Sequence, residues 1–274
     1  MSVDKIRVGN VEILAVEDTP FQFPWQIPFP SVDYAEIEKY KDLYPESYGD
    51  GAMLTHAGTY VLRSEGKTIL CDTGLGPGPT AMLGGVVGKL LDNLAATGVP
   101  AESVDVVAHT HLHLDHVGWN VNADGQPNFP NARYLAPQED WDLMSSNLAA
   151  FPYMDQVIPL KDDGRLDIYS GEQTVTSELT LIPSPGHTPG HHSLMVSSSG
   201  ERAIIMGDMA HHPSQVDQIE WCTAFDLDQA TVIESRRKLF DRAEADGLIS
   251  AFCHFPQPFG KLVRLDGKRV FQAL

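Results

Sequence analysis

The sequence predicts an α/β protein in which two packed β-sheets carry helices on their outer faces. Segments that alternate apolar and polar residues, a pattern typical of half-buried strands, recur along the chain. They form two similar halves, each a set of strands interrupted by helical segments. Because a sheet and a helix must each bury an apolar face, two such halves favour paired sheets with helices outside. We expect the 274 residues (1–274) to form a single domain.

The elements of the first half are predicted from turn signals and apolar spacing. Gly9-Asn10 marks a hairpin turn. Leu90, Leu91 and Leu94 have the spacing of one helix face. The predicted order is a strand pair over 6–16, a hairpin over 59–63 and 67–72, a helix over 86–97, a strand over 104–107, a strand over 133–136 and a helix over 137–144.

The second half has the same kinds of signal. Ser199-Gly200 marks a hairpin turn, and Asp226 or Asp228 is placed to cap a long helix. The predicted order is one or two strands over 167–182, a hairpin over 192–198 and 202–207, a helix over 228–245, and strands over 248–253, 261–265 and 268–272.

An N-terminal segment at about 20–50 is rich in aromatic residues and proline. Its start, residues 21–30, is expected to be neither a regular helix nor a central strand, because proline donates no backbone hydrogen bond. Its aromatic side chains are predicted to line an apolar pocket, to form a dimer arm, or simply to pack on the core. The pocket-wall candidates are Phe23, Trp25, Trp119 and Phe151.

Composition excludes several classes of partner. The net charge of -18, from 37 acidic and 19 basic residues, argues against a nucleic-acid surface and against an anionic membrane face. The sequence has no run of 18 apolar residues, so no membrane-spanning helix is expected, and no apolar leader follows Met1. A cytoplasmic location is therefore expected. The cysteines Cys71, Cys222 and Cys253 form no metal-binding pair and are predicted to be small buried hydrophobes.

The strongest chemical signal is the segment His109-Thr-His-Leu-His-Leu-Asp-His116. It follows a short apolar strand and holds four of the eleven histidines. Because residues i and i+2 of an extended chain lie on the same side, His111 and His113 can reach one metal ion. Asp115 and His116 fall where the chain turns, and they can face a second ion. Imidazole nitrogens and carboxylate oxygens suit Zn²⁺, and also Mn, Fe or Co.

Three later segments complete a predicted two-metal site. His187 lies in the tight loop Pro185-Gly-His-Thr-Pro-Gly190 after a strand. Asp208 and His254 each follow an apolar run, so each is expected at a strand end. With the first cluster they supply enough ligands for two divalent ions.

In these motifs the sequence resembles the metallo-β-lactamase superfamily. The resemblance rests on Asp72-Thr-Gly74, the His111–His116 segment, Gly186-His-Thr-Pro-Gly190, Gly207-Asp208 and His254, in the order typical of that family. It implies a four-layer αββα sandwich with the metals at one edge of the paired sheets. It further implies that His111, His113 and His187 hold one metal, that Asp115, His116 and His254 hold the other, that Asp208 bridges them, and that Asp72 orients His116.

The resemblance implies a binuclear metallohydrolase. A metal-bridged hydroxide would attack the substrate, with Asp115 passing a proton. In Gly186-His-Thr-Pro-Gly-His191, Gly207-Asp-Met-Ala-His211 and Ala251-Phe-Cys-His-Phe-Pro256 the sequence most resembles the branch that holds N-acyl-homoserine lactonases and methyl parathion hydrolase. The small lactonases have a tyrosine three residues after the bridging aspartate, whereas here that position is His211, which either contacts the substrate oxygen or is a solvated loop residue. The expected substrate is a small lactone or ester, with phosphotriesters as a side activity, and a homodimer is expected.

Two alternatives stay open at this point. A glyoxalase II-type thioester hydrolase shares the fold but needs basic residues for its acidic substrate, and Arg236-Arg-Lys238 lies on a predicted helix as a solvated face. A non-catalytic metal-binding protein is the second alternative. Closed structural metal sites leave no position for water, and seven ligands shared by two ions argue against such a site.

Overall fold

The computed structural model describes residues 5–274, which form two seven-stranded sheets. Within each sheet the strands lie beside one another in chain order. The first sheet comprises β1 (Lys5–Val8), β2 (Val11–Pro24), β3 (Ala52–Ser64), β4 (Lys67–Cys71), β5 (Val106–Ala108), β6 (Arg133–Pro137) and β7 (Leu166–Tyr169). The second comprises β8 (Gln173–Thr176), β9 (Leu179–Pro183), β10 (His192–Ser198), β11 (Glu201–Ile205), β12 (Ile249–Ala251), β13 (Phe259–Leu265) and β14 (Lys268–Ala273).

The inner faces of the two sheets meet in one apolar layer. Tyr60 and Leu62 of β3 face this layer and share it with Leu194 of β10. Val61, between them in sequence, faces the opposite side and packs with Leu90. This alternation is the period-two pattern of a strand that is covered on both faces.

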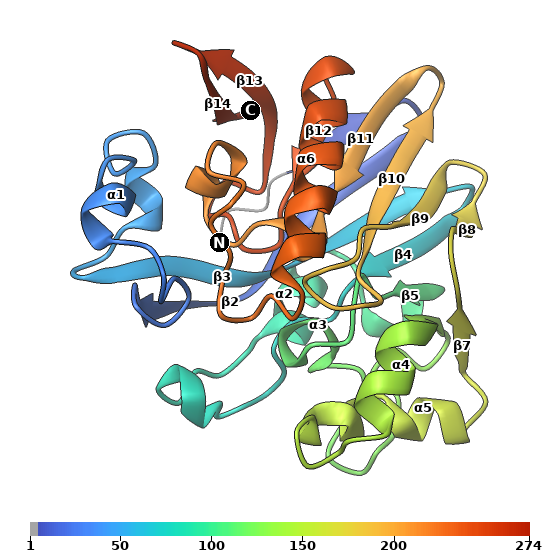
Figure 1. Ribbon diagram of the computed structural model, residues 1–274. Coiled ribbons are helices and arrows are strands. Elements are labelled where there is room, and N and C mark those ends of the chain that lie inside the picture. The colour runs from blue at the N-terminus through green and yellow to red at the C-terminus, as the bar shows by residue number, and fades with distance from the viewer. Residues whose placement is uncertain (1–4) are drawn as a thin grey trace.

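Helices cover the outer faces (Figure 1). Those on the first sheet are α2 (Leu90–Ala96), α4 (Gln138–Ser145) and α5 (Ile158–Asp162). The second sheet is covered by α6 (Gln229–Ala245), whose Phe240 is fully buried beside Phe252. The remaining short helices are α1 (Tyr34–Glu38) and α3 (Leu114–Val117). The predicted four-layer αββα sandwich is confirmed.

Most predicted elements are present, and the helix over 228–245 is correct to within one residue. The Asp228 carboxylate caps α6 by accepting the Thr231 N–H at 3.1 Å. The predicted helix over 86–97 begins later, at Leu90, because the N–H groups of Lys89 and Leu90 donate to the Asp18 carboxylate and residues before them close a loop.

Residues 21–30 contain no helix, as predicted, and their strand residues lie at an open edge rather than in a central strand. Strand β2 continues to Pro24 and pairs with β3 up to Ala52. In the described chain β1 pairs with β2 only as far as Leu14, so the rest of β2 has an open edge on that side. An open edge tolerates proline, which explains how Pro20 and Pro24 are accommodated.

The topology brings several strand ends to one edge of the sandwich. Strands β4 and β5 are parallel, as are β11 and β12. Strand β10 is antiparallel to both β9 and β11, so β9 also runs in the direction of β11. Residues that follow the carboxyl ends of such strands gather at one edge, where ligands bind in open α/β sheets. Within residues 5–274, no helix combines the length and apolar character needed to cross a bilayer.

Candidate metal centre

The predicted ligands all follow strand ends and meet at this edge. The strand runs are apolar because both faces of each sheet are covered, and polar side chains begin where the sheet ends. Asp72 follows β4, the segment from His111 to His116 follows β5 and enters α3, His187 follows β9, Asp208 follows β11, and His254 follows β12.

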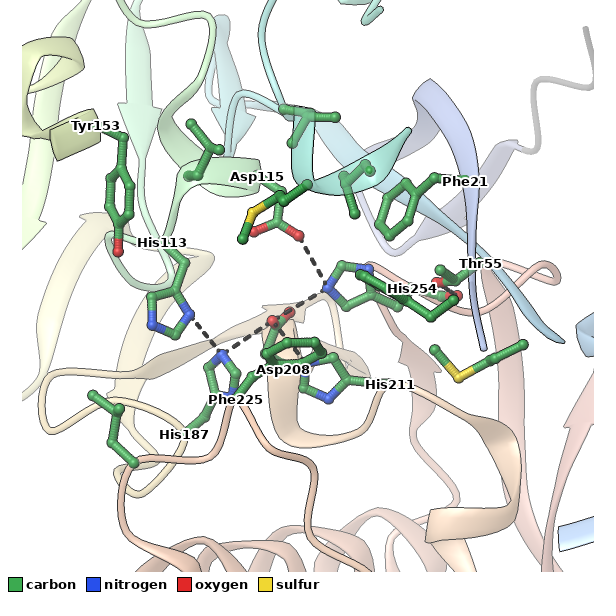
Figure 2. Close-up of a pocket in the computed structure, with 17 residues that line it drawn as sticks. Phe21, Thr55, His113, Asp115, Tyr153, His187, Asp208, His211, Phe225 and His254 are labelled. Carbon is green, nitrogen blue, oxygen red and sulfur yellow. Dashed lines mark hydrogen bonds and ion pairs between the residues drawn. The ribbon is translucent and has the colours of Figure 1, made fainter. Parts of the chain in front are cut away.

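Asp208 is the centre of the arrangement. Its Oδ2 lies 3.2 Å from Nε2 of His187 and 3.2 Å from Nε2 of His254. Its Oδ1 lies 3.2 Å from Nε2 of His116. Figure 2 shows that His187, His211 and His254 reach the same carboxylate from different sides. One buried acidic group therefore contacts imidazoles from several strand ends.

The other ligand atoms separate into two sets on either side of Asp208. In each set three candidate ligand atoms lie within 4.8 Å of one another: His111, His113 and His187 in the first, Asp115, His116 and His254 in the second. These are the two groups that the sequence resemblance implied. Their spacing suits two neighbouring cations that share Asp208.

Most of the rings are held from behind through Nδ1, which leaves Nε2 facing the centre. His116 Nδ1 is 2.9 Å from Asp72 Oδ2, His187 Nδ1 is 3.0 Å from Asp226 Oδ1, and His254 Nδ1 is 2.8 Å from the His56 carbonyl oxygen. An acceptor at Nδ1 fixes the tautomer in which Nε2 carries a free lone pair, the form that binds a metal ion.

His113 has the opposite orientation. Its Nδ1 lies 2.9 Å from Nε2 of His187, so two ring nitrogens point at each other (Figure 2). A cation between them would be bound by both lone pairs. His113 therefore offers Nδ1, and the other histidines offer Nε2.

Burial and charge divide the histidines into two classes. Burial lowers the pKa of His111 well below its ordinary value and lowers the pKa of His113 to about 3, which keeps both rings neutral. Burial also opposes a charge on His116, but the nearby carboxylates, Asp208 foremost, outweigh it and raise its pKa well above the ordinary value. Asp208 itself is buried, yet the surrounding imidazoles hold its pKa well below normal. The centre is thus an ionised carboxylate surrounded by imidazoles, of which His111 and His113 are neutral and His116 is favoured in its charged form.

Several buried atoms of this cluster make no hydrogen bond within the described residues, although His116 Nε2 and Asp208 Oδ1 lie 3.2 Å apart. Nε2 of His111, Nε2 of His116 and Oδ1 of Asp208 are buried and make no hydrogen bond. Buried polar atoms are nearly always satisfied in proteins, so orphaned atoms aimed at one point indicate a bound group. Nitrogen and carboxylate donors fit divalent ions such as Zn²⁺.

Asp140 of α4 joins the two loops that carry the first ligand set. Its carboxylate accepts the N–H of Leu112 at 3.1 Å, the hydroxyl of Thr188 at 2.8 Å and the N–H of Gly190 at 2.7 Å. Burial raises the pKa of this carboxyl group, and the donors oppose that shift. Position 190 must be glycine for this approach, because a Cβ there would lie 2.7 Å from Oδ1 of Asp140.

Asp226 and Arg236 form a second buried support. Asp226 accepts from His187 through Oδ1, and its Oδ2 lies 2.9 Å from the Arg236 guanidinium. Arg236 also donates to the Met209 carbonyl at 2.6 Å, one residue beyond Asp208. The His187 and Arg236 contacts outweigh burial and lower the pKa of Asp226. No local sequence signal indicates these roles, which depend on contacts across the fold. The expectation that Arg236 lies on a solvated helix face is wrong, because its side chain is buried.

A cavity of about 280 Å³ opens directly above the cluster. Its floor includes His113, Asp115, His187, Asp208, His211 and His254 (Figure 2). Its walls are apolar apart from Thr55 and the hydroxyl of Tyr153, and consist of Phe21, Phe23, Met53, Leu75, Met82, Leu83, Leu114, Phe225 and Leu227. A concave apolar site with polar groups at one end is typical of small-molecule binding.

Comparison with known families agrees with this geometry. Residues 56–246 match the family described as the metallo-beta-lactamase superfamily. This match covers more than half of the chain and includes all the candidate ligands except His254. The chain belongs to the metallo-β-lactamase superfamily. The resemblance predicted from the sequence motifs is therefore confirmed.

Curated members of the superfamily with similar sequences include N-acyl homoserine lactonases. An N-acyl homoserine lactonase AttM from Azorhizobium caulinodans is 33% identical over 184 residues, which are 63% of this chain and 66% of that protein. AttM from Rhizobium radiobacter is 30% identical over 128 residues, 42% of this chain and 44% of that protein. The chain spans about half the length of the first such relatives, between 44% and 60%.

Solved structures in the superfamily match over nearly the whole chain. The hydrolase AbOPH has a TM-score of 0.87 at 24% identity, covering 99% of this chain and 97% of that one. AidC, described as a dizinc quorum-quenching lactonase, has a TM-score of 0.86 at 21% identity, covering 100% and 97%. At these identities the likeness establishes the fold.

The predicted pocket wall needs correction. Phe23 lines the cavity, but Trp25, Trp119 and Phe151 do not. Trp25, in the segment that joins β2 to β3, is buried against Tyr48 and His212. Trp119 and Phe151 pack with the cluster between the first sheet and its helices. The sequence placed Trp119 beside the metal motif correctly, but α3 turns its side chain away from the cavity toward Asp18.

The remaining histidines of the superfamily motifs have structural contacts. His191 is buried, and its Nε2 accepts the Asp208 N–H at 3.0 Å. The ring of His192 lies between the carbonyls of Gly190 and Gly171. His211 is not a loop residue in solvent: it is buried, and its Nε2 is 3.3 Å from Asp208 Oδ2.

Proposed function

We propose that this protein is a binuclear metal-dependent hydrolase that opens lactones or cleaves related esters. The observation that supports the proposal most strongly is the convergence of five imidazoles and two aspartates, of which His113, Asp115, His187, Asp208 and His254 form part of the floor of an apolar cavity. His111, His113 and His187 would hold one divalent ion, and Asp115, His116 and His254 the other, with Asp208 shared. Zn²⁺ is the favoured ion, with Mn, Fe or Co as alternatives.

When bound, two such ions supply an activated water at neutral pH and polarise the substrate carbonyl. Two of the chain's own residues, Asp115 and His211, have further roles in the proposal. Asp115 faces the cavity with Oδ2 3.6 Å from His254 Nε2, so its carboxylate can take a proton from the incoming water and deliver it to the leaving oxygen. His211 stacks on His254 with ring centroids 5.0 Å apart, which positions its imidazole to contact the substrate oxygen.

The cavity walls support a substrate with an apolar substituent. Phe21, Phe23 and Phe225 line the cavity, so an acyl or aryl group can be buried among them while its carbonyl lies at Asp208. This fits the lactones named for the curated relatives. Neither lysine nor arginine lines the cavity in residues 5–274, which disfavours a glutathione or coenzyme A thioester.

A metal analysis combined with a substrate panel tests this proposal. We expect about two divalent ions per chain, loss of activity on chelation, recovery on addition of Zn²⁺, and turnover of N-acyl-homoserine lactones or aryl esters. Faster turnover of S-lactoylglutathione would favour the thioesterase alternative. Less than one ion per chain and no turnover of any ester would favour a metal-binding protein without catalysis. The homodimer and the cytoplasmic location stay predictions.

A further inference from the structure

Asp18 is a buried acidic residue outside the metal cluster. It lies where the pairing of β2 with β3 shifts register between Glu17 and Thr19, so it is the extra residue of a β-bulge. A bulge redirects a side chain out of the regular alternation. Here the carboxylate turns into the protein and is 1% exposed.

The Asp18 carboxylate holds both ends of one loop. Oδ2 accepts the N–H of Leu75 at 2.7 Å and of Gly76 at 3.4 Å. Oδ1 accepts the N–H of Lys89 at 2.6 Å and of Leu90 at 2.7 Å. Since Leu75 and Gly76 lie at the start of the 76–88 loop and Lys89 and Leu90 follow its end, a single side chain closes this loop.

The two loop ends are also in direct contact. The Gly88 N–H donates to the Gly76 carbonyl at 3.0 Å. A Cβ at Gly88 would lie 2.3 Å from that carbonyl oxygen and 2.6 Å from Oδ1 of Asp18, so any larger residue would separate the ends. The closure of the loop depends on this glycine and on Asp18 together.

The tip of the 76–88 loop forms part of the cavity wall. Met82 and Leu83 line the cavity, although Met82 is 80% exposed. Leu83 and Val86 pack on a small cluster formed with Phe21. The hydrogen bonds within the tip are local, such as Thr80 N–H to Val86 O at 2.9 Å. The position of the tip over the metal floor therefore depends on how its ends are held.

We propose that Asp18 is a positioning residue that determines how well the cavity accepts long apolar substituents, by holding the 76–88 loop in place as a cavity wall. This rests on the proposed function, because it assumes a substrate whose apolar tail lies against Met82 and Leu83. Asp18 does not touch the metal ligands, so the chemistry at the floor should not depend on it.

The experiment uses the full chain loaded with Zn²⁺ and N-acyl-homoserine lactones from butanoyl to dodecanoyl. Asp18→Asn removes the charge and one of the two acceptor oxygens. We expect KM to rise about tenfold for the dodecanoyl lactone and to stay within about twofold for the butanoyl lactone, with kcat retained for both. Trypsin should cut after Lys89, which is exposed, faster than in the wild type.

Two further variants separate loop closure from general damage. Gly88→Ala keeps aspartate at position 18 but places a Cβ against both its carboxylate and the Gly76 carbonyl, which forces the loop ends apart, and it should reproduce the selectivity loss. Trp119→Phe removes the indole donor to Asp18 Oδ1 at 3.0 Å but none of the loop contacts, and it should resemble the wild type. Should Asp18→Asn fail to fold, Gly88→Ala decides the question.

The proposal would be overturned if Asp18→Asn or Gly88→Ala lowered kcat/KM by the same factor for lactones of every acyl-chain length. It would also be overturned if a variant whose loop trypsin cuts faster kept the wild-type selectivity among acyl-chain lengths. Binding of the apolar dye anilinonaphthalene sulfonate gives a readout that needs no turnover. If the wild type opens no lactone, the proposed function fails, and weaker dye binding by both variants still supports the role of Asp18. Unchanged dye binding would refute that role.

Discussion

At the scale of single residues, His187 shows how a candidate ligand is held from both sides. Its Nε2 faces Asp208, and its Nδ1 lies 3.0 Å from Asp226. These carboxylates outweigh burial and raise the pKa of His187 to about 9. Asp226 is in turn held by the buried Arg236. The orientation of the ring is therefore determined by residues that touch no substrate.

Asp226→Asn should weaken metal binding without unfolding the protein. Asparagine keeps the shape but weakens the hydrogen bond that orients His187, and such changes behind a ligand cost about 10- to 100-fold in metal affinity. Competition with a coloured chelator measures the affinity. Asp228→Asn is the matched control, since Asp228 caps α6 two residues away. Equal affinities for the two variants would contradict the role of Asp226.

The buried imidazole of His212 should make the free energy of unfolding depend on pH. Burial lowers its pKa from 6.5 to about 3, while its Nδ1 accepts the Ser214 N–H at 3.2 Å. The unfolded chain takes up the proton near pH 6.5, and the folded chain does so only near pH 3. This group's contribution to stability is therefore lost as pH falls below about 6.5.

The measurement is denaturant unfolding of the metal-free wild type and of His212→Asn between pH 7 and pH 5. Asparagine can cap the same turn but does not titrate. The wild type should lose about 2 kcal/mol more than the variant over this interval. Parallel curves for the two proteins would show that His212 is not the responsible group.

At the scale of elements, α4 connects the two loops that carry His111, His113 and His187. Asp140 makes the connection through Leu112, Thr188 and Gly190. Asp140→Asn places an amide N–H against one of these donors, which costs about 1–3 kcal/mol for the unsatisfied group. We expect lower thermal stability and lower metal affinity together. Asp142→Asn, on the exposed side of α4, is the control, and equal losses in both variants would argue against a specific connection.

The candidate ligands and the aspartates that support them differ in how far the sequence alone could predict them. The candidate ligands could be proposed from the sequence because each follows an apolar strand and because the dense segment from His111 to His116 gives the weaker signals at His187, Asp208 and His254 a context. The supports Asp18, Asp140 and Asp226 were not, since each is a lone aspartate whose partners are distant in sequence. The prediction that aromatic residues of the N-terminal segment line a pocket is correct for Phe21 and Phe23 but wrong for Trp25, which is buried in the core. Whether a residue belongs to a wall or to the core depends on the path of the chain after Pro24.

At the scale of the molecule, the sandwich and the metal centre have separate sources of stability. The apolar layers between and outside the sheets contain most of the buried side chains, and the metal cluster lies at the edge. An apolar core of this extent folds without a metal. The cluster itself gathers five imidazoles around Asp208, an arrangement that is costly to bury without cations.

Removal of metal should therefore lower the melting temperature but leave the fold in place. Ions bound only by the folded state add about 2.7 kcal/mol for each ion present at one hundred times its dissociation constant. We expect the chelated protein to keep its far-ultraviolet circular dichroism and a cooperative transition, at a melting temperature that rises with added Zn²⁺. Asp208→Ala should lose most of this dependence, because in the proposed site both ions would share that carboxylate. If the chelated wild type lost its cooperative transition, the folding of the sandwich would depend on the metal, and its stability would not be independent of the metal centre.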